Sequence, residues 1–207
     1  MKLKRIPFAL TLAGLLLAAA CGGGNPPSGG GTPEPLATDA PWPAPSNPLQ
    51  LAQRADLVLE KKEFLLYHVH AHLDVFLNGV KVLVPAGIGV NINDPGVKHG
   101  PGPSYGGISM CDQPCISPLH THTIDGILHT ESKESKPNTL GQFFIEWDVK
   151  LDANCVGEHC KPATPINIYV NGALYSGNPA DILLTNKKEI AIVIGTPPAA
   201  IPKEFPK

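Results

Sequence analysis

Residues 65–77, with the sequence LLYHVHAHLDVFL, decide the fold of this chain. All seven odd-numbered positions are apolar, whereas three of the even positions are histidine. Side chains alternate between the two faces of a β-strand, so this pattern predicts a strand with one face on a core. Asn78-Gly79 follows directly and is typical of a two-residue hairpin turn. The alternating residues 80–84 then predict the returning strand.

The rest of the chain repeats these strand and turn signals and has few helical ones. Asn171-Gly172 marks another hairpin, and residues 190–194 predict a last strand. Asn47-Pro48 predicts the start of a short helix, and residues 140–147 predict another. Glycine and proline number 21 and 23, which favours a turn-rich β protein. We therefore expect a mainly β fold, an antiparallel β-sandwich or open barrel with one or two short helices.

The N-terminal residues have the features of an export signal. Residues 1–20 combine a basic start, a short apolar run and small residues before Cys21. The segment resembles a bacterial lipoprotein signal, in which the cysteine is lipidated and its lipid chains hold the protein to a membrane. An ordinary secretory signal is the alternative. Residues 21–48 are rich in glycine and proline and predict a tether, which leaves residues 49–207 as a single β-rich domain.

Three histidines lie on the polar face of the first predicted strand. His68, His70 and His72 are spaced by two, so all three point away from the apolar face. Consecutive side chains on one face are about 6.6 Å apart, so neighbouring imidazoles can approach one ion, while three require a bend. These histidines are candidate metal ligands or residues that support the ligands. A solvated strand face is the alternative.

A second histidine group lies in PLHTHTIDGILHTES, residues 118–132. If Asp125-Gly126 forms a two-residue turn, His122 faces His129 and His120 faces Glu131. All four side chains then share one face, with facing Cβ atoms about 5 Å apart. The opposite face, which we expect to lie nearer to water, carries Thr121, Thr123, Leu128 and Thr130.

Imidazoles and a carboxylate gathered on a buried face need partners, because unsatisfied buried polar groups are costly. A divalent transition metal satisfies them together through nitrogen and oxygen ligands, at about 2.0–2.2 Å for zinc. We therefore predict a site for zinc or Cu(II), with iron or manganese behind them, at His120, His122, His129 and Glu131. A hydrogen-bonded network without metal is the alternative.

The histidine motifs also carry a family resemblance. Over most of residues 50 to 200 the chain is similar to an uncharacterised family of bacterial extracytoplasmic proteins, on the motifs HVHAHL (68–73), PAGIG (85–89), HTH (120–122), GILH (126–129) and TLGQFF (139–144). This resemblance implies a location outside the cytoplasm and brings no activity with it. The HTH motif with a later acid and histidine is also similar to the cupin metal motif, but Asp125 stands where that motif has glutamate.

Four cysteines follow Cys21 in the chain: Cys111, Cys115, Cys155 and Cys160. An even number in an exported chain predicts two disulfides, with three connectivities open. A thiolate metal site with His159 as a further ligand is the alternative.

Composition and motifs narrow the function. The formal net charge is −2 and no basic patch is present, which argues against nucleic acid as a partner. Nucleotide-binding and GxSxG motifs are absent. We expect a membrane-tethered lipoprotein that binds or delivers a metal outside the cytoplasm. A metalloenzyme with Glu131 or Asp125 as general acid–base, and a structural lipoprotein without metal, are the alternatives.

Overall fold

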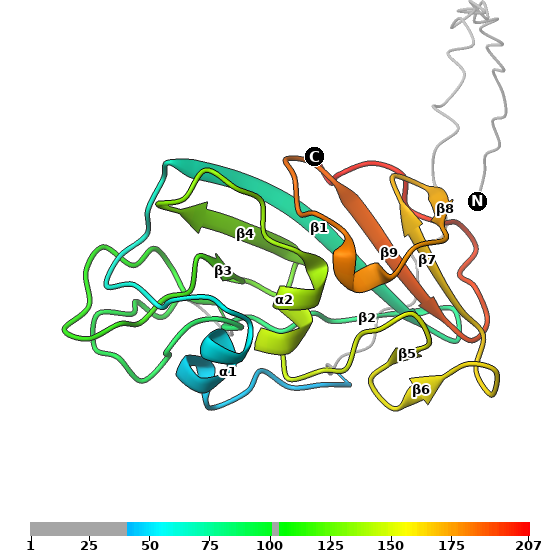
Figure 1. Cartoon of the computed structure of the whole chain (residues 1–207), viewed down its shortest axis with the longest axis horizontal. Coiled ribbons are helices and arrows are strands. Elements are labelled where there is room, and N and C mark those ends of the chain that lie inside the picture. The colour runs from blue at the N-terminus through cyan, green and yellow to red at the C-terminus, as the bar shows by residue number, and fades with distance from the viewer. Residues whose placement is uncertain (1–40, 101–103) are drawn as a thin grey trace, which may run out of the picture. The chain divides into compact units, whose positions relative to one another are not determined.

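One seven-stranded mixed sheet forms the centre of the computed structural model, which describes residues 41–100 and 104–207 (Figure 1). Six strands lie in the order β3 (Leu119–His120), β4 (Ile127–Ser132), β1 (Tyr67–Leu77), β9 (Glu189–Ile194), β7 (Ile166–Val170) and β8 (Ala173–Tyr175), and β2 (Val80–Val82) pairs with β1. A separate ribbon contains β5 (Cys155–Val156) and β6 (His159–Cys160). The helical elements are α1 (Pro48–Arg54), α2 (Leu140–Glu146) and the short 3₁₀ helix η1 (Pro179–Asp181). The predicted mainly β class with short helices is confirmed.

The sheet is mixed because β9 enters it between β1 and β7. Strand β9 runs parallel to β1, with Leu73 opposite Ile190, and antiparallel to β7. The other strand pairs of the sheet are antiparallel, as expected. All six residues of β9 are buried, which fits a central strand covered on both faces.

Both predicted Asn-Gly hairpins are present. Asn78 and Gly79 have φ values of 52° and 83° and join β1 to β2, with Leu77 opposite Val80. Asn171 and Gly172 have similar φ values and join β7 to β8. Positive φ at both turn positions matches the twist of the flanking strands, which explains why this dipeptide closes both hairpins.

The main core lies on the face of the sheet that carries the odd-numbered residues of β1. Helix α2 lies across this face and is fixed at its start by a capping box between Thr139 and Gln142 (Figure 1). Its aromatic residues pack with α1 and with the central strands, and the most deeply buried members include Leu73, Val75, Phe143, Phe144, Trp147, Ile190 and Ile192. Burial of large apolar side chains of this kind contributes about 1.5–3 kcal/mol each.

The opposite face of the sheet is divided into two parts. At one end Phe76, Ala191 and Val193 form a small apolar cluster with Tyr169 and Ile201 packed against it. At the other end the same face carries the histidines of β1 and the acidic and histidine side chains of its neighbours. The functional candidates therefore lie on the back of a well-packed sheet.

The predicted signal peptide, the predicted lipidation site Cys21 and most of the predicted tether lie outside the described residues. The last part of that tether contacts the domain: the Trp42 ring packs edge-on against Trp147, with ring centroids 5.7 Å apart. Trp42 Nε1–H donates a hydrogen bond to Glu158 at 2.9 Å. None of the described helices is long and apolar enough to cross a membrane.

Candidate metal centre

Three adjacent strands bring the two histidine groups together. In the row where β3, β4 and β1 pair, His120 lies opposite His129, and His129 lies opposite His70. Two residues further along, in the next row on the same face, Glu131 of β4 lies opposite His68 of β1. Because side chains of one register row project from the same face of a sheet, these five residues share one surface.

The predicted two-residue turn at Asp125-Gly126 is wrong. His120 pairs with His129 and not with Glu131, so the register differs by two residues, and residues 121–126 form a longer connection. The Gly126 carbonyl accepts a hydrogen bond from Leu73 N at 2.9 Å, which docks this connection on β1. A Cβ on Gly126 would lie 2.6 Å from the Leu73 carbonyl oxygen, so the docking requires glycine.

An even register difference leaves every side chain on its predicted face. His120, His122, His129 and Glu131 therefore still converge, with ligand atoms within 4.8 Å of one another, and we call this group the hairpin centre. The expectation that the opposite face lies nearer to water is wrong, because that face belongs to the main core. Thr121, Leu128 and Thr130 are fully buried there.

Hydrogen bonds fix the tautomers of two rings in the hairpin centre. His120 Nδ1 lies 2.8 Å from the Ser117 carbonyl oxygen, and His122 Nδ1 lies 2.7 Å from the Tyr105 carbonyl oxygen. A carbonyl oxygen only accepts, so both Nδ1 atoms carry the proton and donate it. The Nε2 atoms of the two neutral rings then each present a lone pair, and they face one another at 3.1 Å.

Burial keeps these two rings neutral. Desolvation, with the neighbouring His122 and His129, lowers the pKa of His120 to about 3. Desolvation and His129 also lower the pKa of His122. The deprotonated form is the one that binds a metal ion, so the environment keeps both rings ready to act as ligands at neutral pH.

Glu131 supplies an anionic donor at the edge of the hairpin centre. Its Oε1 lies 3.4 Å from His129 Nδ1 and 3.3 Å from His68 Nε2, while its Oε2 is buried without a hydrogen-bond partner. Burial raises the pKa of this carboxyl, but the His129 hydrogen bond and the surrounding imidazoles outweigh it and lower the pKa to about 2. The residue is only 8% exposed, so within residues 41–100 and 104–207 a carboxylate oxygen is buried without a hydrogen-bond partner.

The strand histidines do not act as one group. His68 and His70 form a second group of donors with Glu131, and their Nε2 atoms are 3.1 Å apart. His70 also packs against His129, with ring centroids 4.4 Å apart. His72 turns to a third group with Asp74 and Glu189, so it does not join the hairpin centre.

The third group has the chemistry of a buried ion pair. His72 Nδ1 lies 2.8 Å from Glu189 Oε2, and His72 Nε2 lies 2.9 Å from the Asp125 carbonyl oxygen. Both ring nitrogens therefore face acceptors, which suits a doubly protonated ring. Burial lowers the pKa of His72, but the Glu189 hydrogen bond and the Asp74 charge outweigh it and raise the pKa. Lys81 adds an ion pair to Asp74.

Two acidic residues near the histidines have no signal in the sequence. Glu63 Oε1 lies 3.6 Å from His122 Nε2, although Glu63 precedes the strand in a charged stretch that reads as solvent-exposed. Glu189 lies 117 positions from its partner His72. Neither contact follows from local spacing, because each depends on how distant segments pair.

The four cysteines that the structure describes take no part in these groups. Cys111 is bonded to Cys115, and Cys155 is bonded to Cys160. The prediction of two disulfides is confirmed, with the local connectivity of the three that were open. His159, proposed as a thiolate-site ligand, instead lies 3.4 Å from Glu158.

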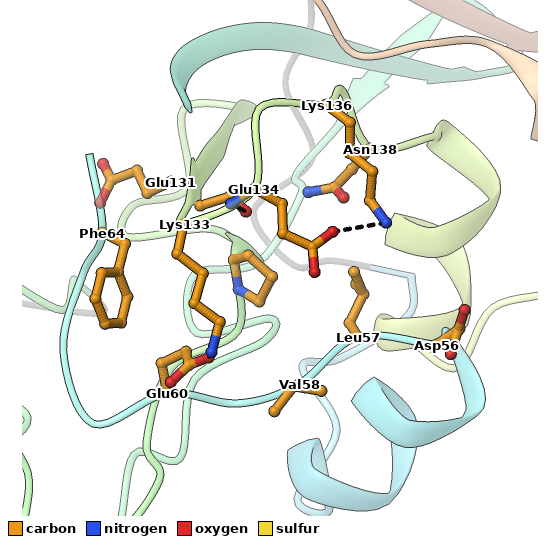
Figure 2. Close-up of a pocket in the computed structure, with 12 residues that line it drawn as sticks. Asp56, Leu57, Val58, Glu60, Phe64, Glu131, Lys133, Glu134, Lys136 and Asn138 are labelled. Atoms are coloured by element: carbon orange, nitrogen blue, oxygen red, sulfur yellow. Dashed lines mark hydrogen bonds and ion pairs between the residues drawn. The ribbon is translucent and has the colours of Figure 1, made fainter. Parts of the chain in front are cut away.

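Two hollows border the centre. Figure 2 shows one of them, in which Glu131 forms the wall beside Phe64 and its carboxylate points away from Lys133 and Glu134. The lysines here are paired, Lys133 with Glu60 and Lys136 with Glu134. The other hollow is lined by His70, His72, Asp74, Glu189 and the C-terminal residues 204–207.

These groups of histidine and acidic side chains could hold a metal ion, and the described residues contain three such groups. Comparison of the chain with protein-family models, with curated proteins and with solved structures finds no match.

Proposed function

We propose that this chain is an extracytoplasmic lipoprotein, held to a membrane through Cys21, that binds a divalent transition metal at the hairpin centre. The observation that carries the metal proposal is the 3.1 Å approach of the His120 and His122 Nε2 atoms, whose Nδ1 protons are committed to carbonyl oxygens. Two lone pairs at this distance repel one another unless a proton or a cation lies between them. Burial disfavours the proton, so a metal ion is the better partner.

The spacing of the donors supports the same conclusion. Two ligand atoms at about 2.1 Å from one tetrahedral zinc lie about 3.4 Å apart. The His120–His122 separation is 3.1 Å, and the His129–Glu131 separation is 3.4 Å. Imidazole nitrogens with one carboxylate suit zinc or Cu(II) first, and iron or manganese after them. Binding or delivery of such an ion is the function we propose.

The carbonyls of Ser117 and Tyr105 support the proposal from outside the ligand set. Each accepts the Nδ1 proton of one histidine, which orients the ring and makes its Nε2 a better donor. Such partners of ligating histidines affect metal affinity by about 10–100-fold.

Metal content of the full chain tests the site. We expect the purified protein, stripped with chelator and reloaded, to retain zinc through dialysis. The double variant His120→Ala/His122→Ala should bind zinc at least about 100-fold more weakly, because two of four donors are lost. His159→Ala removes a histidine outside the three groups and should change nothing. Equal zinc affinity in the double variant and the wild type would contradict the proposal.

Anchoring is tested separately at Cys21. We expect the wild-type chain to fractionate with membranes and to incorporate a labelled fatty acid. Cys21→Ser should remove the label and release the chain into the soluble extracytoplasmic fraction, because a single thiol carries the lipid in such proteins. Label retained in Cys21→Ser would contradict lipidation at this residue while leaving the metal proposal intact.

A further inference from the structure

We infer that the site holds two transition-metal ions bridged by Glu131, one at the hairpin centre and a second at His68 and His70. This inference rests on the proposed function, because the second ion shares a ligand with the first. It follows from the way Glu131 stands between two sets of imidazoles that belong to different strands.

The two sets together offer more donors than one ion takes. A tetrahedral ion binds four ligands, whereas the sets contain five imidazoles and one carboxylate. The hairpin centre and the His68–His70 pair form separate groups, each with its ligand atoms within 4.8 Å, and Glu131 is their common member. The five histidines therefore define two coordination positions.

The donors of the second position are spaced for one ion. His68 Nε2 lies 3.1 Å from His70 Nε2 and 3.3 Å from Glu131 Oε1. These separations lie close to the roughly 3.4 Å expected between ligands of a tetrahedral ion. The rings of His70 and His129 are in contact across the β1–β4 pair, with centroids 4.4 Å apart, so the two positions adjoin.

The carboxylate of Glu131 suits a bridge. Its Oε1 faces His129 on one side and His68 on the other. Its Oε2 is buried and has no hydrogen-bond partner among the residues that the structure describes, and the residue is 92% buried, which is costly for a polar atom. Both short contacts are made by Oε1, so two ions that share this oxygen would bind it from both sides and balance the negative charge. Two-metal sites in proteins hold their ions about 3.5–4 Å apart, a distance that one carboxylate can span.

The register of the sheet makes this arrangement rigid. His120, His129 and His70 occupy one row across β3, β4 and β1, and Glu131 and His68 occupy the next. Neighbouring strands lie about 4.8 Å apart, so the backbone itself sets the spacing of the two positions. Four of these five residues lie within paired segments of β1 and β4, where the ladder fixes their orientation. The third group, His72 with Asp74 and Glu189, is not an alternative site for the second ion, because both nitrogens of His72 already face acceptors.

Copper titration of the full chain tests the bridge. Chelator-stripped protein is loaded with Cu(II) in glycine buffer, which removes weakly held copper, and bound copper is counted and recorded by electron paramagnetic resonance. We expect two Cu(II) per wild-type chain. Because neighbouring spins couple, the resonance should be broadened and its integrated intensity should be lower than that of the same number of isolated Cu(II) ions. His68→Ala/His70→Ala should bind one Cu(II) with an ordinary isolated signal, and His159→Ala should behave as the wild type.

The outcomes separate this inference from the proposed function. One Cu(II) per wild-type chain, or two in His68→Ala/His70→Ala, overturns the second position and leaves the hairpin centre standing. No tightly held copper in the wild type overturns both. Glu131→Gln should abolish the spin coupling, and coupling that persists in it overturns the bridge. His68→Ala alone, at the more exposed position, provides the same stoichiometric test if the double variant does not fold.

Discussion

The hairpin centre and the group of His72, Asp74 and Glu189 occupy the same face of one sheet and use the same kinds of side chain, yet they are built for different partners. In the hairpin centre the Nδ1 protons are bound to carbonyls and the lone pairs of His120 and His122 face one another. In the other group both nitrogens of His72 face acceptors, and Lys81 pairs with Asp74. The position of the protons, more than the number of donors, decides which group suits a metal.

The largest expected effect separates the two groups by stability. His72→Ala leaves the buried carboxylate of Glu189 without its cation, while Asp74 keeps its ion pair with Lys81, and we expect the change to reduce the free energy of unfolding by about 3–5 kcal/mol. Zinc bound per folded chain should stay unchanged. His120→Ala should lower the affinity for zinc. It should reduce the free energy of unfolding by less than His72→Ala does, because it also removes the repulsion between the Nε2 lone pairs of His120 and His122.

Urea unfolding of the metal-free chain, read beside zinc content, checks this contrast. Glu189→Gln provides a milder variant of the same ion pair, because the amide keeps an acceptor for His72. If either change at the ion pair lowered the zinc content of the folded protein, the two groups would not be independent and the contrast would fail.

A smaller effect separates the groups by the sign of their pH dependence. The pKa of His120 is about 3 in the folded protein, below its ordinary value of 6.5. Between these values the unfolded chain binds a proton that the folded chain does not, so stability falls as pH falls. From pH 7 to pH 5 this one residue removes about 2 kcal/mol. The pKa of His72 is raised, so its contribution is complete below pH 6.5 and is lost as pH rises through its folded pKa.

Unfolding of the metal-free protein at pH 7 and pH 5 measures the difference directly. His120→Gln should reduce the acid-induced loss of stability by about 2 kcal/mol, since the unfolded chain then lacks that proton. His72→Asn should increase the acid-induced loss, since it removes an interaction that strengthens in acid. An unaltered pH dependence in His120→Gln would show that this ring has the same pKa in the folded and the unfolded chain, and would contradict the prediction.

Local patterns in the sequence predict which side chains gather on this face of the sheet. They do not predict which histidine nitrogens carry protons, and that difference distinguishes the two groups. Alternation in β1 and the two Asn-Gly turns depend on neighbouring residues, so the strand, its faces and the hairpins follow from the sequence. The grouping of side chains in the hairpin centre is predicted correctly although the predicted register is wrong. The predicted register differs from the observed one by two residues, and an even difference keeps each side chain on the same face of the sheet.

The remaining features depend on contacts between distant segments. The insertion of β9 parallel to β1 brings Glu189 to His72, and this pairing turns one of three equally spaced histidines into an ion-pair partner. The Ser117 and Tyr105 carbonyls fix the tautomers, but backbone acceptors leave no mark in side-chain spacing. The sequence thus indicates which residues lie close together, whereas the protonation and tautomer of each histidine depend on contacts that form only in the complete fold.

The smallest expected effect concerns Glu63, which lies near the hairpin centre but outside its donor group. Glu63 Oε1 is 3.6 Å from His122 Nε2 and also accepts a hydrogen bond from the Ile108 backbone. A nearby carboxylate strengthens a metal site by its charge even without ligating the ion.

We expect Glu63→Gln to weaken zinc binding roughly tenfold, about 1.4 kcal/mol, with the number of bound ions unchanged. Glu60→Gln is the matched control, because Glu60 pairs with Lys133 and not with a histidine. Calorimetric titration of zinc into both variants would distinguish these roles: a change in stoichiometry for Glu63→Gln would make Glu63 a ligand, and equal weakening by both variants would reduce its role to general surface charge.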